Sequence, residues 1–244
     1  MRGRLHRLAG SVTIMRTLKK AVLAVLQGDD FSLRFRELCT LPPRQVVNPL
    51  FSFFLHADER TRWRAITAMG AVVAGLADED MESARVVMRR LLWSLNDESG
   101  GIGWGAPEAI GEILSVHEGL AKEYGTVLIS FIWKDGNFLE HEMLQRGALW
   151  GVGRAAHARP ELMKGALPHL IAFLDASDAV ARGLAAWAIG ALDPKPARSK
   201  LEALLKDDTQ ISIYADGEIR SSRVSDLAWN ALTAMEDKQR RGSP

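Results

Sequence analysis

Carboxylates and a histidine near the middle of the chain are the side chains whose types and spacing could do chemistry. Glu98, Glu108, Glu112 and His141 could converge between neighbouring helices, shift one another's pKa values and so act as catalytic groups. A solvated rim of paired charges explains the same residues without catalysis, and we favour it. The segment "LEHEM" around His141 is not the H-E-x-x-H of a zinc helix, because position 145 is Gln. We therefore expect no catalytic residues, no metal ion and no cofactor.

A glycine-rich stretch, "NDESGGIGWGAPEAIGEIL" (96–114), offers a second possible chemistry. Gly101, Gly103 and Ala106 match the G-x-G-x-x-A spelling of a dinucleotide-binding loop. Such a loop works because it follows a β-strand and leads into the N-terminus of a helix. The residues before this stretch have helical periodicity instead. We expect a turn between two helices, with Pro107 near the first turn of the second one.

The overall composition limits the class of protein. The chain has 244 residues, 47% of them apolar, and a formal net charge of +1, so no global field recruits nucleic acid or an anionic membrane. No apolar run reaches the roughly 18 residues that cross a bilayer. Cys39 is the single cysteine, which excludes an intrachain disulfide and fits a reducing compartment. We expect a cytoplasmic protein that binds neither membranes nor nucleic acid.

An internal repeat dominates the rest of the sequence. Four segments align without gaps: "RWRAITAMG" (62–70), "GWGAPEAIG" (103–111), "QRGALWGVG" (145–153) and "RGLAAWAIG" (182–190). Their closing glycines are spaced by 41, 42 and 37 residues, and a degenerate fifth copy, "SDLAWNALT", occupies 225–233. A period near 40 with small residues at helical spacing is typical of paired helices stacked into a solenoid.

Each repeat segment follows a more strongly apolar helical segment, so each repeat contains an outer and an inner helix. Ala and Gly let the inner helices approach closely, while larger aliphatic residues fill the gaps between repeats. The sequence predicts an all-α fold, a right-handed α-solenoid of about five helix pairs. One domain is expected over 15–236, with a flexible arm at 1–14 and a flexible tail at 237–244.

These segments resemble HEAT repeats, in particular the short HEAT-like type named after the phycobilisome lyases. The resemblance covers about residues 42 to 236. It implies the solenoid fold and leaves the activity open, because a fold does not fix a function.

Residues 210–224, "QISIYADGEIRSSRV", interrupt the helical pattern. Apolar and polar residues alternate around Asp216-Gly217, a dipeptide that strongly favours a β-hairpin. We expect a small hairpin between the last two helices, either as a solvated excursion or as a flap over the C-terminal end of the groove.

Aligning the inner helices also aligns a stripe of residues on the face opposite the core, which lines the concave groove in a HEAT-like stack. Tryptophans and charged residues recur on this stripe, and both types are common where proteins bind partners. The candidate partner-binding groove consists of Trp63, Trp104, Glu108, Glu112, Arg146, Trp150, Arg154 and Trp187. In the alternative, the hairpin, loops or N-terminal arm cover these tryptophans, and Glu108 pairs with Arg146 across neighbouring repeats.

Three functions remain open from the sequence. The leading one is a non-enzymatic scaffold that holds a protein partner in the groove. The alternative is a HEAT-like enzyme or chaperone-lyase with a tryptophan-lined pocket, since some HEAT-like proteins are DNA glycosylases and others attach chromophores. A glycosylase also needs a basic track for phosphates, and acids beside Arg146 and Arg154 disfavour one. The third is a purely structural subunit of a larger assembly.

Overall fold

The computed structural model of the chain describes residues 16–96, 103–215 and 217–241, and only the backbone of 235–241. Two N-terminal helices, residues 16–27 and α2 (Phe31–Thr40), precede five helix pairs. The outer helices are α3 (Pro43–Phe53), α5 (Met81–Ser94), α7 (Glu118–Ser130), α10 (Leu167–Phe173) and α12 (Arg198–Leu204). Short turns precede the last two of these: α9 (Pro160–Met163), η1 (Lys164–Ala166) and η2 (Lys195–Ala197). The inner helices are α4 (Glu59–Glu79), α6 (Ala106–Val116), α8 (Glu142–Ala158), α11 (Ala179–Ala191) and α13 (Val224–Arg241).

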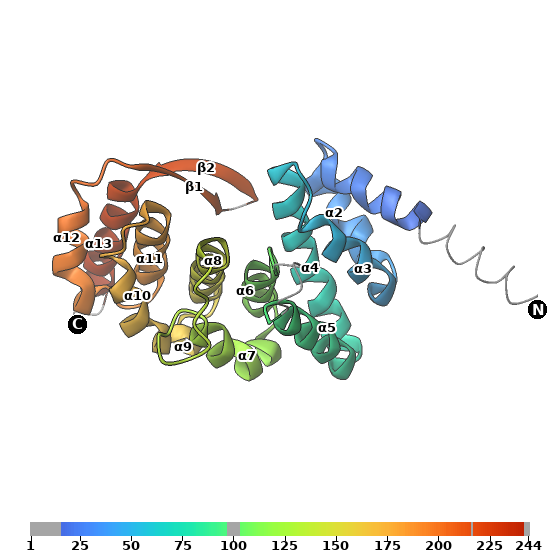
Figure 1. Cartoon of the computed structure of the whole chain (residues 1–244), viewed down its shortest axis with the longest axis horizontal. Coiled ribbons are helices and arrows are strands. Elements are labelled where there is room, and N and C mark those ends of the chain that lie inside the picture. The colour runs from blue at the N-terminus through green and yellow to red at the C-terminus, as the bar shows by residue number, and fades with distance from the viewer. Residues whose placement is uncertain (1–15, 97–102, 216, 242–244) are drawn as a thin grey trace, which may run out of the picture.

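The five inner helices pack side by side in sequence order, while α5, α7, α10 and α12 lie along the other side (Figure 1). This arrangement confirms the predicted α-solenoid of about five helix pairs. Residues 1–14, the predicted arm, lie outside the described part of the chain. Helix α13 reaches Arg241, inside the predicted tail at 237–244, whose flexibility stays a prediction.

Short polar side chains start several of these helices. Asp58 accepts a hydrogen bond from the backbone N–H of Thr61 at 2.8 Å, and Asp178 does the same for Val180 and Ala181 at the start of α11. Each carboxylate satisfies amides that have no partner inside the helix, and it lies at the positive end of the helix dipole. The sequence predicted a cap or turn at both positions.

The small residues of the repeat allow very close helix packing between α6 and α8. A Cβ placed on Gly111 would lie 2.2 Å from the Cα of Gly151, so only two glycines permit this approach. On the face of α6 opposite the stripe, Ala106, Ile110 and Ile113 are at most 2% exposed. The helical phase derived from the repeat is therefore correct for the core.

The glycine-rich stretch joins α5 to α6, and residues 97–102 of it lie outside the described part. At its described end, Gly105 adopts a φ of 78° directly before α6, a conformation that glycine accepts without strain. Pro107 lies in the first turn of α6, as predicted. The preceding element is the helix α5, so the strand that a dinucleotide-binding loop requires is absent at this point.

The predicted hairpin is present. Strand β1 (Gln210–Ala215) pairs antiparallel with β2 (Glu218–Arg223), from Gln210 opposite Arg223 to Ala215 opposite Glu218. The hairpin extends along the concave side from the C-terminal repeats towards α4 (Figure 1). It thus reaches much further than the C-terminal end of the groove.

Candidate functional site

All eight predicted groove residues come from the inner helices or, for Trp104, from the turn before α6. Their surroundings divide them into three sets. Trp63, Trp104 and Glu108 line a pocket at the N-terminal ends of α4 and α6. Glu112, Trp150, Arg154 and Trp187 line a cavity beside the hairpin, and Arg146 lines neither. The structure therefore separates residues that the sequence placed in one continuous groove.

The tryptophan stripe is largely covered, as in the alternative in which the hairpin packs over it, and does not face solvent along its whole length. Trp150 is only 3% exposed, and Trp63 and Trp187 are half-buried. Trp93 and Trp229, which lie off the stripe, are 77% and 62% exposed. The helical phase correctly placed the stripe opposite the core, but sequence periodicity carries no information on what packs over that face.

Tyr214 of β1 is the residue that covers the stripe. Its ring stacks on Trp63 with centroids 4.7 Å apart, and its backbone carbonyl accepts a hydrogen bond from Trp150 Nε1 at 2.8 Å. The Tyr214 hydroxyl lies 2.9 Å from Thr67 Oγ1, and burial raises the pKa of this phenol. These contacts fasten the hairpin to α4 and α8.

Sequence reasoning missed Tyr214 as part of the site, although it predicted the hairpin. One signal was available: a tyrosine two residues before the Asp-Gly turn, in a chain with two tyrosines, lies where a flap would touch the groove. Thr67, one helical turn after Trp63 on α4, was not among the predicted groove residues. His157, whose ring stacks on Trp187 with centroids 4.7 Å apart, was considered only as one of six histidines.

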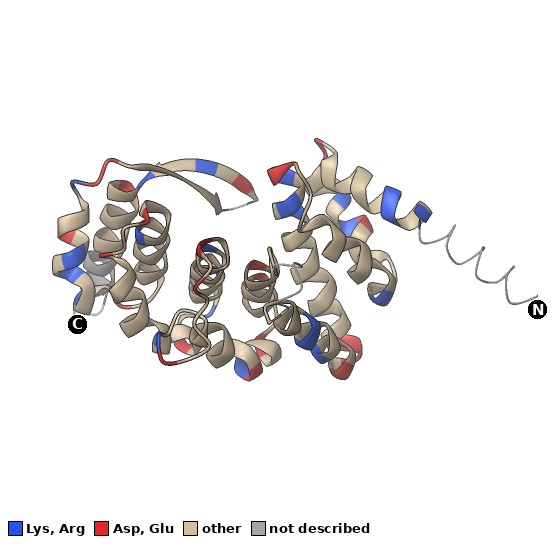
Figure 2. Ribbon diagram, viewed as in Figure 1, with Lys and Arg blue, Asp and Glu red and all other residues tan. Residues whose placement is uncertain are grey.

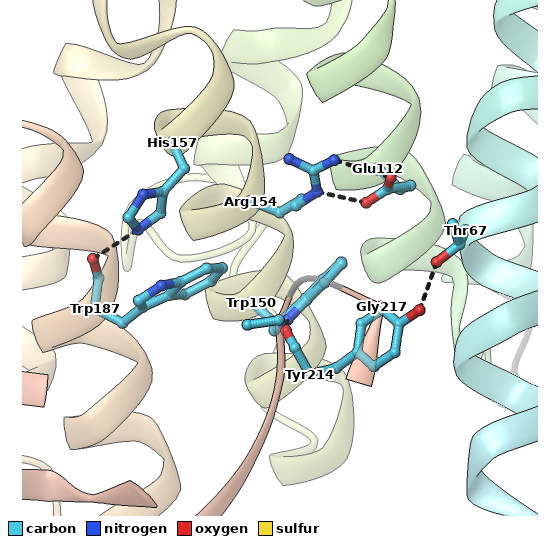
Figure 3. A pocket seen from close by; sticks show the side chains of 9 residues that line it. Thr67, Glu112, Trp150, Arg154, His157, Trp187, Tyr214 and Gly217 are labelled. Atoms are coloured by element: carbon cyan, nitrogen blue, oxygen red, sulfur yellow. Dashed lines mark hydrogen bonds and ion pairs between the residues drawn. The ribbon is translucent and has the colours of Figure 1, made fainter. Parts of the chain in front are cut away.

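We call the space beside the hairpin the hairpin cavity, and its volume is about 540 Å³. Figure 3 shows aromatic rings on one side and a charged pair on the other. Arg154 on α8 donates from Nε and Nη2 to the two carboxylate oxygens of Glu112 on α6, at 2.7 and 3.1 Å. The Glu112 side chain is 7% exposed, so this two-bond pairing satisfies a buried charge. The cavity is lined by Thr67, Glu112, Trp150, Arg154, His157, Trp187, Tyr214, Ala215 and Gly217.

Arg146 connects two neighbouring helices. It donates to both carboxylate oxygens of Asp178 at 2.8 and 2.9 Å and pairs with Glu142 on its own helix. Since Asp178 also caps α11, Arg146 links α8 to the start of the next inner helix. The alternative pairing of Arg146 with Glu108 does not occur.

We call the second space the Trp104 pocket; its volume is about 360 Å³. Three exposed apolar residues surround it: Leu55 at 59%, Trp104 at 43% and Met143 at 50% exposure. Exposed apolar residues that gather around a pocket are typical of binding surfaces. The pocket is lined by Phe54, Leu55, His56, Ala57, Glu59, Arg62, Trp63, Ile66, Trp104, Gly105, Glu108 and Met143.

Glu108 gives this pocket an unusual carboxyl group. Its Oε2 is fully buried and has no hydrogen-bond partner among the described residues. Burial raises the pKa of Glu108 to about 7, although a bond to its own backbone and the charge of Arg62 act in the opposite direction. The carboxyl group lies over Gly147 of α8, where an added Cβ would come within 2.6 Å of it. Glu108 is therefore about half protonated at neutral pH.

The predicted convergence of carboxylates with His141 is not seen in the described part of the chain. His141 is exposed at the start of α8, and Glu98 lies outside the described residues. Within the described ranges, no three His, Cys, Asp or Glu side chains are grouped as metal ligands. The same ranges contain no helix long and apolar enough to cross a membrane.

Comparison with known proteins agrees with the architecture. Residues 142–192, which span α8 to α11, match the sequence model of the HEAT-like repeat family. This match identifies a HEAT-like repeat at residues 142–192, and the stacked helix pairs of the whole array support a HEAT-repeat architecture.

One sequence relative and one solved structure are also similar to this chain. An uncharacterized protein of Archaeoglobus fulgidus is 28% identical over 187 residues, which is 73% of this chain and 91% of the relative. A designed armadillo repeat protein in complex with the peptide (KR)4 is 20% identical, with a TM-score of 0.50 over 89% of this chain and 99% of the other. At this level of identity the structural likeness concerns the fold alone.

Proposed function

We propose that the protein is a non-enzymatic scaffold that binds a segment of a partner protein on its concave face, with the Trp104 pocket as the main docking point. The exposure of Trp104, Leu55 and Met143 around one pocket carries this proposal. A large aromatic residue that keeps 43% of its surface exposed beside a hollow is a typical anchor in protein interfaces. The designed armadillo repeat neighbour, which holds a peptide, supports binding as a use of this fold.

The lining of the pocket defines the segment that fits. Trp63, Ile66 and Trp104 offer apolar walls, and a pocket of about 360 Å³ accommodates one large side chain. Because burial raises the pKa of Glu108 to about 7, its negative charge at neutral pH is smaller than that of an ordinary carboxylate. The partner segment is therefore expected to insert an aromatic or large aliphatic residue.

The remaining predicted groove residues receive different roles in this proposal. Trp63 and Glu108 form the inner wall of the Trp104 pocket. Trp150, Glu112 and Arg154 position the hairpin and hold α6 against α8, and Arg146 fixes the start of α11. Trp187 lines the hairpin cavity and contacts no partner segment bound at Trp104.

An enzymatic function has one observation in its favour, because a carboxyl group with a pKa near 7 is typical of a general acid. The Oε2 of Glu108 is buried and the carboxyl group lies against Gly147 of α8, an arrangement that does not favour contact with a substrate. We therefore favour binding over catalysis.

Peptide selection tests the proposal. Random peptides displayed on phage are selected on the wild-type protein, and affinities of enriched peptides are then measured by fluorescence anisotropy. We expect a shared aromatic or aliphatic anchor and a loss of about 30-fold on Trp104→Ala. Trp229→Ala is the matched control, because Trp229 is also well exposed but lies on α13. No enrichment, or equal loss on both variants, would contradict the proposal.

A further inference from the structure

The hairpin cavity contains features that fastening the hairpin does not require. Its volume of about 540 Å³ lies within the range of small-molecule sites. Trp187 supplies the more accessible aromatic surface, since Trp150 and Tyr214 are 3% and 5% exposed, and Arg154 supplies a planar cation at the opposite side (Figure 3). An aromatic wall facing a small number of fixed polar groups is typical of pockets that orient a ligand.

Arg154 uses only part of its hydrogen-bonding capacity. Its Nε and Nη2 pair with Glu112, whereas Nη1 has no hydrogen-bond partner among the described residues. In Figure 3 the guanidinium edge away from Glu112 faces the side where His157 lies. A guanidinium paired along one edge can still bind a second carboxylate along its other edge.

The charges around the cavity favour an anion. Glu112 balances Arg154, but Arg64 on α4 forms no ion pair with any described residue. Its guanidinium is held by the backbone carbonyls of Leu26 and Gly28 at 2.8 Å. Arg64 is close enough to Tyr214 to lower the pKa of that phenol, against the larger effect of burial. Among the described residues, two arginines and one carboxylate therefore act on the Tyr214 hydroxyl.

The shape of the cavity specifies the rest of the ligand. Trp187 stacks on His157 and lies beside Trp150, with the two indole centroids 6.4 Å apart. A planar ring placed against the accessible part of Trp187 buries apolar area in an orientation that aromatic pairs prefer. A carboxylate attached to that ring by a short linker reaches Arg154.

From this arrangement we propose that the hairpin cavity binds a small aromatic monocarboxylate, with the carboxylate on the free edge of Arg154 and the ring against the accessible part of Trp187. This site is separate from the Trp104 pocket. The two proposals therefore succeed or fail independently.

Acid and amide pairs test the site directly. Benzoate, phenylacetate and indoleacetate are titrated against benzamide, phenylacetamide and indoleacetamide, with binding followed by fluorine NMR of protein labelled with fluorotryptophan. We expect at least one acid to shift the Trp150 and Trp187 signals and to bind about 10- to 100-fold more tightly than its amide, as charge-assisted hydrogen bonds do. Equal binding of acid and amide, or no binding of any acid at millimolar concentration, would overturn the proposal.

Arg154→Lys sharpens the test. Lysine keeps the charge that pairs with Glu112 but lacks the second donor edge, so acid binding should fall about 10-fold. Arg146→Lys is the control, because Arg146 forms a similar two-bond pair outside the cavity. Acid binding that survives Arg154→Lys in a folded protein would also overturn the proposal. If that variant fails to fold, the acid and amide comparison on the wild type still decides the question.

Discussion

Glu108 and Glu112 lie one helical turn apart on α6, yet their surroundings differ. Glu112, under the hairpin, receives two hydrogen bonds from Arg154. Glu108, beside the open Trp104 pocket, leaves Oε2 without a partner, and its pKa is raised to about 7. The Glu112 carboxylate is therefore fully paired where the hairpin covers the concave face, whereas the Glu108 carboxyl group is not fully paired where apolar residues remain exposed. A partner gains most binding free energy where it can bury exposed apolar residues and satisfy an unpaired polar group.

The largest expected effect on stability comes from breaking the Glu112–Arg154 pair, in the part of the concave face that the hairpin covers. Arg154→Met leaves the Glu112 carboxylate buried without a partner, and we expect a loss of about 3 to 5 kcal/mol in the free energy of unfolding. Urea denaturation at neutral pH measures it. The double variant Arg154→Met/Glu112→Leu should recover most of the loss, because both members of the pair are replaced by apolar groups. If the double variant is as unstable as the single one, the pair is not what stabilises this region.

Removing the carboxylate charge of Glu108, beside the open Trp104 pocket, should increase the free energy of unfolding. The folded-state pKa of Glu108 is raised from 4.5 to about 7, so its carboxylate form costs stability progressively as pH rises from 4.5 to 7. Glu108→Gln should therefore match the wild type near pH 4 and be more stable above pH 7, by up to about 3 kcal/mol. Denaturation curves from pH 4 to 8.5 check this. A stability difference that does not change with pH would contradict it.

The close approach of α6 and α8, which buries both carboxylates, can be tested at its contact point. In Gly111→Ala the new Cβ meets the backbone of Gly151, and we expect a loss of about 2 to 3 kcal/mol. Gly75→Ala in α4 is the control. Nothing lies within 4 Å of a Cβ there, so better helix propensity should stabilise the protein by up to about 1 kcal/mol. Equal melting temperatures for the two variants would show that the contact is looser than described.

The smallest expected effect concerns the end of the hairpin that touches α4. Tyr214→Phe removes the hydroxyl that contacts Thr67 but keeps the ring stacked on Trp63. We expect a loss of about 1 kcal/mol and faster amide hydrogen exchange in β1 and β2. Thr67→Val should have a similar effect, and no further loss is expected when both changes are combined. Additive losses would mean that the two groups act separately.

The fold could be predicted from the sequence because it depends on local periodicity. Ala106, Ile110 and the closing glycines recur at helical spacing, and their burial follows from packing between neighbouring repeats. The hairpin was predicted from Asp216-Gly217 for the same reason, since turn preference is local. These features need no knowledge of distant parts of the chain.

The site was predicted only in part because it depends on contacts between distant residues. Trp150 and Tyr214 are 64 residues apart, and nothing in the alternation of β1 specifies where the hairpin lies. The pairing of Glu112 with Arg154 agreed with the expectation that acids of one helix face arginines of the next. The partner of Arg146 was not foreseen, because Asp178 was interpreted only as a cap.

The central claim is that a partner protein binds at the Trp104 pocket and does not disturb the part of the concave face that the hairpin covers. Fluorine NMR of fluorotryptophan-labelled protein tests it directly, with signals assigned by single Trp→Phe substitutions and a display-selected peptide as ligand. We predict that the Trp104 and Trp63 signals move on peptide binding while the Trp187 signal does not. Movement of the Trp150 and Trp187 signals with Trp104 unchanged would contradict the account.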